Sequence, residues 1–172
     1  VQTLAAYFDD EITAMPNLVT VGATQQLTTL AGIPFYSDST SLYTHNVSGT
    51  DATAQKNTAI GFTAMDAITT GDNNSAFGYD ALGANTTGAY NTAVGEIALS
   101  SNTTAGENTA IGRASMENTT TGAANTAVGY SSLRINTTGA NNTAVGQTAL
   151  YANTTGANNV AVGLQALDAN TT

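Results

Sequence analysis

The chain has few side chains that could carry out acid–base, nucleophilic or metal chemistry. Charged residues make up 9% of its 172 residues, there is one histidine, His45, and there is no cysteine. No catalytic triad and no histidine metal site can be assembled around His45 within one chain. The acidic residues are spread over unrelated positions, so no nucleophile–base pair or two-carboxylate site can be nominated. We therefore predict that the protein is not an enzyme and has no cofactor and no metal site.

Three other patterns suggest ligands, but each has a simpler interpretation that we favour. Asp72-Asn73-Asn74 is rich enough in oxygen to touch calcium, but it lacks the remaining ligands and is better interpreted as a turn. Three copies of His45 in a trimer would meet at an axis and could bind an ion there, whereas a packed or exposed histidine is favoured. The nine Asn-x-Ser/Thr sequons would accept glycans in a glycosylating secretory pathway and are otherwise turn sequence; they include Asn46, Asn85, Asn102, Asn136, Asn141 and Asn153.

The charge balance restricts the partners of the protein. Twelve acidic residues oppose three basic ones, Lys56, Arg113 and Arg134, which gives a formal net charge of -9. A polyanion would be repelled, so nucleic acid is excluded as a partner. No apolar run approaches the ~20 residues that a membrane helix needs, so no membrane insertion is expected. The first residue is Val and the last repeat stops three residues short, which we interpret as the ends of a fragment or a processed piece.

A seventeen-residue repeat runs from Asn57 to Thr172 without insertion or deletion and organises most of the chain. A fixed period of this kind is typical of stacked repeat architectures. The ninth place of every copy is Leu or Met, and the thirteenth and fourteenth are Thr-Thr. Each copy begins with Asn and has Gly at its fifth place: Asn57, Asn74, Asn91, Asn108, Asn125, Asn142 and Asn159, followed by Gly61, Gly78, Gly95, Gly112, Gly129, Gly146 and Gly163.

The order of residue types within a copy predicts a strand, a bend, a second short strand and a turn. Asn159-Val160-Ala161-Val162-Gly163 alternates as a strand should, and the apolar fourth place is expected to face the interior of the coil. Gly at the fifth place suits a bend, and Asn-Thr-Thr-Gly suits a turn. Seven such rungs would stack at about 4.8 Å into a rod of roughly 30 Å. The repeated Asn, Gly and Thr-Thr are then structural ladders that need no ligand.

The pattern of apolar residues within one rung indicates that several copies of the chain assemble. The eighth and ninth places are sequence neighbours, so on a strand they would face opposite sides. The Leu and Met of the ninth place would then form a stripe that a monomer exposes. We therefore predict a homotrimer in which this stripe helps form the core between subunits.

The first 56 residues do not follow the repeat. Val1, Leu4, Phe8, Ile12 and Met15 share one face of a predicted short amphipathic helix, which Pro16 ends. Short β-like runs follow at Leu18–Val21, 26–30, 33–36 and 41–47. The predicted organisation is thus a helix and a strand-and-turn connector over residues 1–56, followed by an all-β parallel solenoid, or β-roll, over residues 57–172.

Two families of fibrous proteins resemble this repeat. Asn159-Val160-Ala161-Val162-Gly163 is similar to the Ser-Val-Ala-Ile-Gly motif of trimeric autotransporter adhesin heads, which use a shorter repeat. The runs from Asn125 to Gly139 and from Asn142 to Gly156 resemble repeats in phage tail-fibre proteins that end in a self-cleaving intramolecular chaperone, and Asn17 to Gly22 has a similar character. The resemblance implies a trimeric, extracellular virion fibre that contacts a host surface, and it carries no catalytic residue.

The sequence leaves several functions open. A phage tail fibre that attaches to a host cell is favoured, with a bacterial surface adhesin or a self-polymerising extracellular filament as alternatives. An ice-binding solenoid is more remote, because the Thr-Thr pairs occupy a turn. Binding to a host glycan or protein would use the variable sixth and tenth places, where Tyr79, Tyr130 and Tyr151 are the candidate contacts for a sugar ring. Scattered surface aromatics are the simpler interpretation of these tyrosines.

Overall fold

The computed structural model describes residues 54–171 in full and, before them, the backbone of six short strands. The chain divides into two compact units, Val1–Tyr36 and Ser37–Thr172. The described part is all-β and contains no helix. The predicted helix over Val1 to Met15 lies outside the described residues.

The first unit contains two antiparallel strand pairs. β1 (Leu18–Val21) pairs with β2 (Thr24–Leu27), with Leu18 opposite Leu27. β3 (Thr29–Leu30) pairs with β4 (Ile33–Pro34). The sequence predicted the strand at Leu18–Val21, whereas the run expected over residues 26–30 is divided between β2 and β3.

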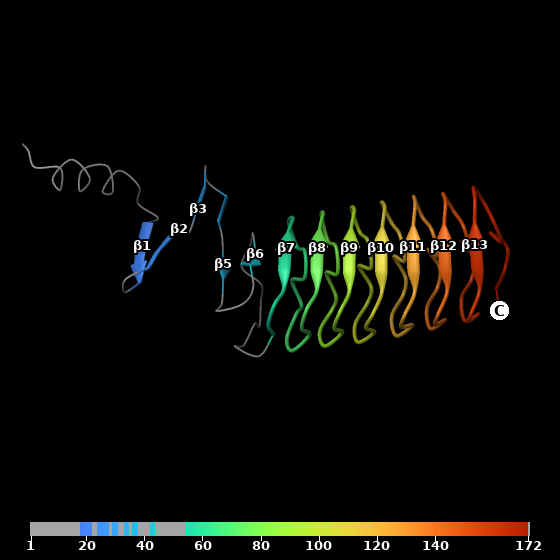
Figure 1. Cartoon of the computed structure of the whole chain (residues 1–172), viewed down its shortest axis with the longest axis horizontal. Helices are drawn as coiled ribbons and strands as arrows, with labels where there is room; N and C mark the ends of the chain where they lie inside the picture. Colours follow the sequence, from blue (N-terminus) through green and yellow to red (C-terminus); the bar gives the residue numbers. More distant parts are fainter. Residues whose placement is uncertain are drawn as a thin grey trace, which may run out of the picture. The chain divides into compact units, whose positions relative to one another are not determined.

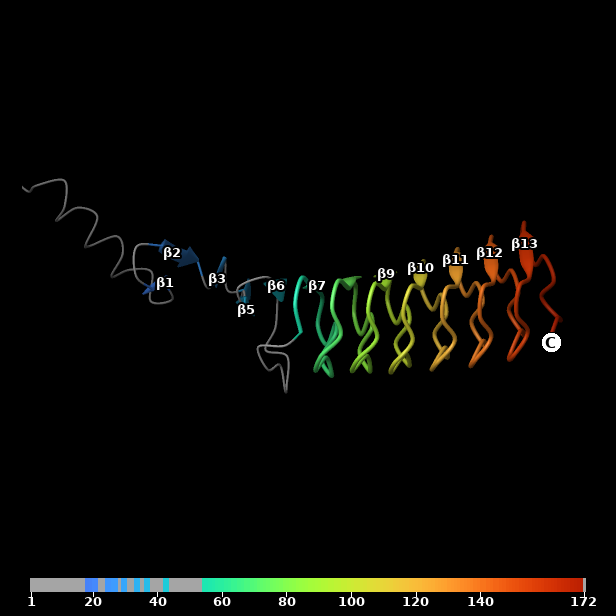
Figure 2. The ribbon, with the colours of Figure 1, turned by 60° about the horizontal axis from the view of Figure 1, so that its bottom comes forward.

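The second unit is a parallel β-solenoid. Its nine-stranded sheet has the order β5 to β13, and seven of these strands, β7 to β13, have three residues each and come from the seventeen-residue copies. From β7 to β13, successive strands pair in parallel with a shift of one copy, so that Thr58 lies opposite Ser75 and Ile60 opposite Phe77. Figures 1 and 2 show these strands side by side, one per turn of the coil. The strands are β5 (Tyr36–Ser37), β6 (Leu42–Tyr43), β7 (Thr58–Ile60), β8 (Ser75–Phe77), β9 (Thr92–Val94), β10 (Thr109–Ile111), β11 (Thr126–Val128), β12 (Thr143–Val145) and β13 (Val160–Val162).

The second strand expected in each copy is absent from the described rungs, and a run of turns replaces it. In the first copy, N–H groups three residues further on donate to the carbonyls of Gly61, Thr63 and Met65. Thr63 and Met65 adopt φ of 59° and 53°, in the left-handed region, and the same places do so in every copy. Left-handed backbone interrupts the alternation of a strand, so two consecutive side chains can face the same side.

The Leu and Met of the ninth place therefore lie inside the coil, which corrects the prediction that they form an exposed stripe. Met65, Leu82, Leu99, Met116, Leu133 and Leu150 are 0% exposed, and only Leu167 on the last rung is open. Alanine or serine of the eighth place is buried beside them. One large apolar side chain per rung thus forms the core of a single chain.

The strand faces are also the reverse of the prediction. The third-place alanines, such as Ala76 and Ala93, are buried, whereas the fourth-place apolar residues face outward. The physical reason is the narrow coil: a core already filled by Leu or Met leaves room opposite the strand for a methyl group only. Ile60 and Phe77 are each 41% exposed.

Glycine at the fifth place is required by two features of the backbone. Gly61 has φ of 143°, and the fifth-place glycines as a group lie between 128° and 143°. A Cβ atom on Gly61 would also collide with the carbonyl oxygen of Gly78 on the next rung. The stacked rungs therefore approach too closely here for any side chain.

Buried asparagines close each turn of the coil. The side-chain amide of Asn57 donates to the carbonyl of Gly71, fourteen residues later, at 2.8 Å. Its Oδ1 accepts the backbone N–H of Asn74 on the next rung, also at 2.8 Å. The same pair of bonds recurs up the ladder, so one side chain links the two ends of its own turn and the next turn.

A second ladder of buried asparagines occupies the twelfth place, and Thr119 interrupts it. The amide of Asn102 donates to Oδ1 of Asn85 at 2.9 Å, and that of Asn153 donates to Oδ1 of Asn136 at 3.1 Å. Thr119 cannot supply the equivalent amide, and both its hydroxyl and Oδ1 of Asn102 are buried without a partner. An unsatisfied buried polar group costs about 1–3 kcal/mol.

Replacing Thr119 with asparagine should stabilise the protein. The new amide would donate to Oδ1 of Asn102 and to the carbonyl of Gly122, and its own oxygen would accept from Asn136. We expect the free energy of unfolding to rise by about 1–2 kcal/mol, measured by urea denaturation. The matched variant Asn153→Thr copies the defect two ladder steps away and should lower stability by a similar amount. Equal stability of T119N and the parent would contradict this account of the ladder.

Candidate functional surfaces

The variable sixth and tenth places form two columns of side chains along the outside of the coil. Each column contains Glu, Arg and Tyr on three successive rungs. They are Glu96, Arg113 and Tyr130 at the sixth place and, one rung later, Glu117, Arg134 and Tyr151 at the tenth. In the sixth-place column, Arg113 Nε lies 2.9 Å from Glu96 Oε2, and its guanidinium lies 5.7 Å from the ring centre of Tyr130. The bond to Glu96 raises the pKa of Arg113. These contacts link neighbouring rungs at the surface, where charge pairs add little to stability.

The tenth-place column makes the more enclosed set of contacts. Arg134 Nε lies 2.6 Å from Glu117 Oε2, and the bond to Glu117 raises the pKa of Arg134. Its Nη1 donates a long hydrogen bond of 3.5 Å to the hydroxyl of Tyr151. The Tyr151 ring is therefore held from the rung before it.

The three tyrosines predicted as surface contacts lie in these columns, and each has a partner in its own chain. Tyr79 stacks on Phe62, with ring centres 6.2 Å apart and planes 13° apart. Tyr130 lies under Arg113, and Tyr151 contacts Arg134. The coil thus places the three side chains on different rungs and in two columns, and does not gather them into one site.

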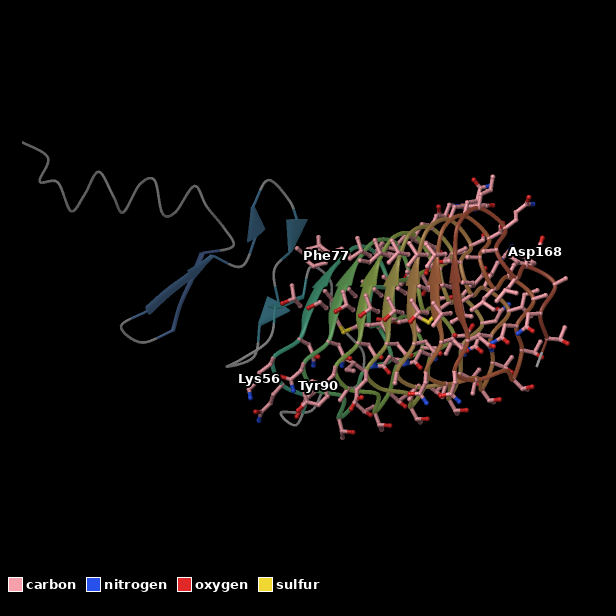
Figure 3. The ribbon with its side chains drawn as sticks, turned by 45° about the vertical axis from the view of Figure 1, so that its right-hand side comes forward. Lys56, Phe77, Tyr90 and Asp168 are labelled. Atoms are coloured by element: carbon pink, nitrogen blue, oxygen red, sulfur yellow. The ribbon has the colours of Figure 1, made fainter. Side chains whose placement is uncertain are left out.

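The outer face of the parallel sheet is a surface that the sequence analysis missed. Its second-place row is Thr or Ser, with Val160 last, and its fourth-place row is Ile, Phe or Val, so neither row contains a charged residue. Figure 3 shows Phe77 on this face. The sequence pattern that could have identified this surface is the constant small alanine at the third place, between the larger residues of the second and fourth places.

Four of the asparagine sequons lie inside the coil. Asn85, Asn102, Asn136 and Asn153 are each 0% exposed. A glycan could not be carried there by the folded chain, so these four are turn sequence, as favoured. The thirteenth-place threonines beside them donate from Oγ1 to the next rung, as Thr69 does to the carbonyl of Thr86 at 2.9 Å, while the fourteenth-place threonines from Thr70 to Thr155 are exposed.

A small hollow of about 160 Å³ opens between the last two rungs, lined by Thr148, Tyr151, Gln165 and Asp168. These residues come from the seventh and tenth places of adjacent copies. Sequence reasoning singled out Tyr151 but gave no role to the seventh place. Figure 3 labels Asp168 on the last rung.

The carboxyl group of Asp80, at the seventh place of the second copy, is partly buried. Partial burial raises the pKa of Asp80, a hydrogen bond with Thr63 opposes the rise, and the negative charge of Asp66 adds to it. The charged form of this side chain is therefore less favourable in the folded than in the unfolded chain.

Among residues 54–171 and the described strands, no three His, Cys, Asp or Glu side chains lie close enough to hold a metal ion. Within the same residues there is no helix with the length and apolar character to cross a membrane. Asp72 Oδ1 accepts the backbone N–H of Gln55 at 2.7 Å, which places the Asp72-Asn73-Asn74 run in the contacts between rungs.

Comparison of the chain with protein-family models, with curated proteins and with solved structures found no match.

Replacing Asp80 with asparagine should stabilise the protein at pH 7. The pKa of Asp80 is higher in the folded than in the unfolded chain, so its charge costs folding free energy above the folded pKa. This cost disappears as the pH falls below the unfolded value. We expect a gain of less than about 1 kcal/mol at pH 7, because solvent screens the group, and no gain at pH 3. Thermal melts at both pH values test this. The control Glu107→Gln corrects for the change in net charge. An equal gain in stability from D80N at both pH values would contradict the cost assigned to the Asp80 charge.

Proposed function

We propose that this chain is a rigid segment of a homotrimeric surface fibre of the phage tail-fibre kind, which lies outside the cell as part of a virion and reaches and attaches to a host surface. The observation that carries the proposal is the uncharged outer face of the parallel sheet, with its continuous apolar fourth-place row. The inward residues are all used to build the coil, so the outward rows are what remains for assembly and contact.

A parallel sheet normally has both faces covered. Here the inner face packs on the core, but the outer one is open: Val94 is 37% and Ile111 40% exposed in the single chain. The fourth-place row repeats such a residue on seven rungs, which makes a continuous apolar strip about 30 Å long. Strips of this size on a soluble protein mark interaction surfaces.

A second and third copy of the chain are the occupants that suit this strip. Rods that assemble side by side around an axis parallel to their length keep every rung in register, and identical rows then meet along the axis. Fully burying a Val or Ile side chain contributes about 1.5–3 kcal/mol, so covering the remaining two-fifths contributes about 1 kcal/mol per rung. Because seven rungs in each of three chains contribute, the total free energy of burying the strip is substantial. The absence of charge in the strip means that association leaves no buried charge unpaired.

The oligomeric state tests the proposal. The mass of one chain is 17.3 kDa, so native mass spectrometry of the trimer should give three times this mass, about 52 kDa. The double variant Val94→Glu, Ile111→Glu places two like charges per chain on the strip and should give monomers that keep the solenoid spectrum by circular dichroism. Ile111→Cys, in a chain without cysteine, should form disulfide-linked dimers on oxidation, because the rows of two chains meet at the axis.

The matched control is Thr104→Glu, Thr121→Glu, which adds the same charge to the same two rungs at exposed turn positions. It should remain trimeric. A monomeric parent chain, or a trimer that survives V94E and I111E unchanged, would refute this interface. An indefinite rod in place of a finite trimer would favour the self-polymerising filament, and a membrane-anchor barrel encoded downstream of Thr172 would favour the bacterial adhesin.

One observation supports a second candidate function, an ice-binding surface. The second-place threonines lie on the flat outer face of the sheet beside the fourth-place row, and not only in the turns. Hydroxyl and methyl groups thus repeat at about 4.8 Å along the rod and about 7 Å along each strand, which is the kind of flat array that can order water.

A measurement of thermal hysteresis distinguishes trimer assembly from ice binding, because a face covered by other chains cannot bind ice. We expect no freezing-point hysteresis from the trimer. A monomeric chain with measurable hysteresis that V94E and I111E abolish would support ice binding in place of the fibre.

A further inference from the structure

The hollow between the last two rungs has a lining that no structural role explains. It combines one aromatic ring, Tyr151, with a hydroxyl, an amide and a carboxylate, from Thr148, Gln165 and Asp168. Elsewhere in the tenth-place column, Glu117 and Arg134 pair with each other and fill the surface between their rungs. Asp168 follows Tyr151 in the column, and within the described residues no ion pair engages its carboxylate.

The lining residues are held in place by the backbone of the coil. The N–H of Gln165 donates to the carbonyl of Gln147 at 2.9 Å, and the carbonyl of Asp168 accepts from Ala152 at 2.9 Å. The Tyr151 hydroxyl accepts from Arg134, which leaves the phenolic hydrogen free to donate. Thr148 uses its own hydrogen on the carbonyl of Gln147 at 2.8 Å, so its oxygen remains an acceptor. The hollow therefore offers both donors and acceptors around one ring.

We propose that this hollow binds a single neutral pyranose ring, as the glycan contact of the fibre; the inference thus rests on the proposed attachment function. The C–H face of a sugar would lie on Tyr151, and adjacent hydroxyls would donate to Asp168 and Thr148 and accept from the Gln165 amide. A volume of about 160 Å³ is well below that of drug-sized sites and holds one small ring.

The charges favour a neutral sugar over an acidic one. Asp168 would repel a sugar carboxylate or sulfate, and Arg134 is already engaged by Glu117. The whole chain, with its formal charge of -9, adds to this repulsion. One shallow site of this kind gives a dissociation constant of about 1 mM, and three copies in a trimer would raise the affinity for a glycan-coated surface.

The test uses the trimeric full chain and NMR titration with the methyl glycosides of glucose, galactose, mannose and N-acetylglucosamine. At least one neutral glycoside should shift the resonances of Tyr151 and Gln165 with a dissociation constant near 1 mM, and N-acetylneuraminic acid should not. Tyr151→Ala and Asp168→Asn should each weaken binding at least tenfold.

The matched control is Tyr130→Ala, which removes the equivalent tyrosine of the sixth-place column and should leave binding unchanged. Native mass spectrometry of every variant separates this inference from the fibre itself. A trimer that binds none of the glycosides, or binds them equally after Y151A, overturns the sugar site and leaves the proposed fibre intact. Stronger binding of the acidic sugar than of the neutral ones also overturns it.

Discussion

Buried asparagine side chains hold the coil closed, because each amide must find partners where water does not reach. In the first-place ladder, each side-chain amide donates to the carbonyl fourteen residues later. Its Oδ1 accepts the backbone N–H of the asparagine on the next rung. A turn with one residue more or fewer would misplace this carbonyl and leave a buried amide unpaired, at a cost of about 1–3 kcal/mol per turn. The strict seventeen-residue period follows from this constraint, and the stacking of identical side chains follows from the period.

The same constraint explains how the chain uses left-handed backbone at non-glycine residues. Positive φ at the seventh and ninth places costs free energy that an isolated peptide would not recover. In the coil it turns the eighth and ninth side chains inward together. The N–H groups of the seventh and ninth places donate to neighbouring rungs, and that of the eighth place donates to the fifth-place carbonyl of its own turn. Burial of one Leu or Met per turn offsets part of the cost. Local strain and core packing are therefore two aspects of one arrangement.

Because the interior is fixed so closely, most of the variation lies on the outside, where it creates three distinct surfaces. The strand face is uncharged and carries an apolar row, which suits association of like chains. The sixth- and tenth-place columns carry Glu, Arg and Tyr that contact one another from rung to rung. The seventh and tenth places together line the hollow beside Tyr151. The proposed assembly face and the proposed recognition site thus occupy different positions within the repeat.

The sequence by itself determined the period and the parallel all-β solenoid, since a repeat of Asn, Gly and Thr at fixed spacing has few ways to stack. The buried ladder of twelfth-place asparagines, which the sequence indicated only as turns, emerged from the structure. It also located the candidate tyrosines in variable places. Only the tertiary structure decided which apolar row is inside. Strand periodicity assigned Ile60 to the core and Met65 to the surface, whereas the structure places Met65 inside and leaves Ile60 41% exposed. The reason is that left-handed φ at Thr63 and Met65 breaks the alternation on which that assignment depended, and such φ values at Thr and Met cannot be inferred from residue type.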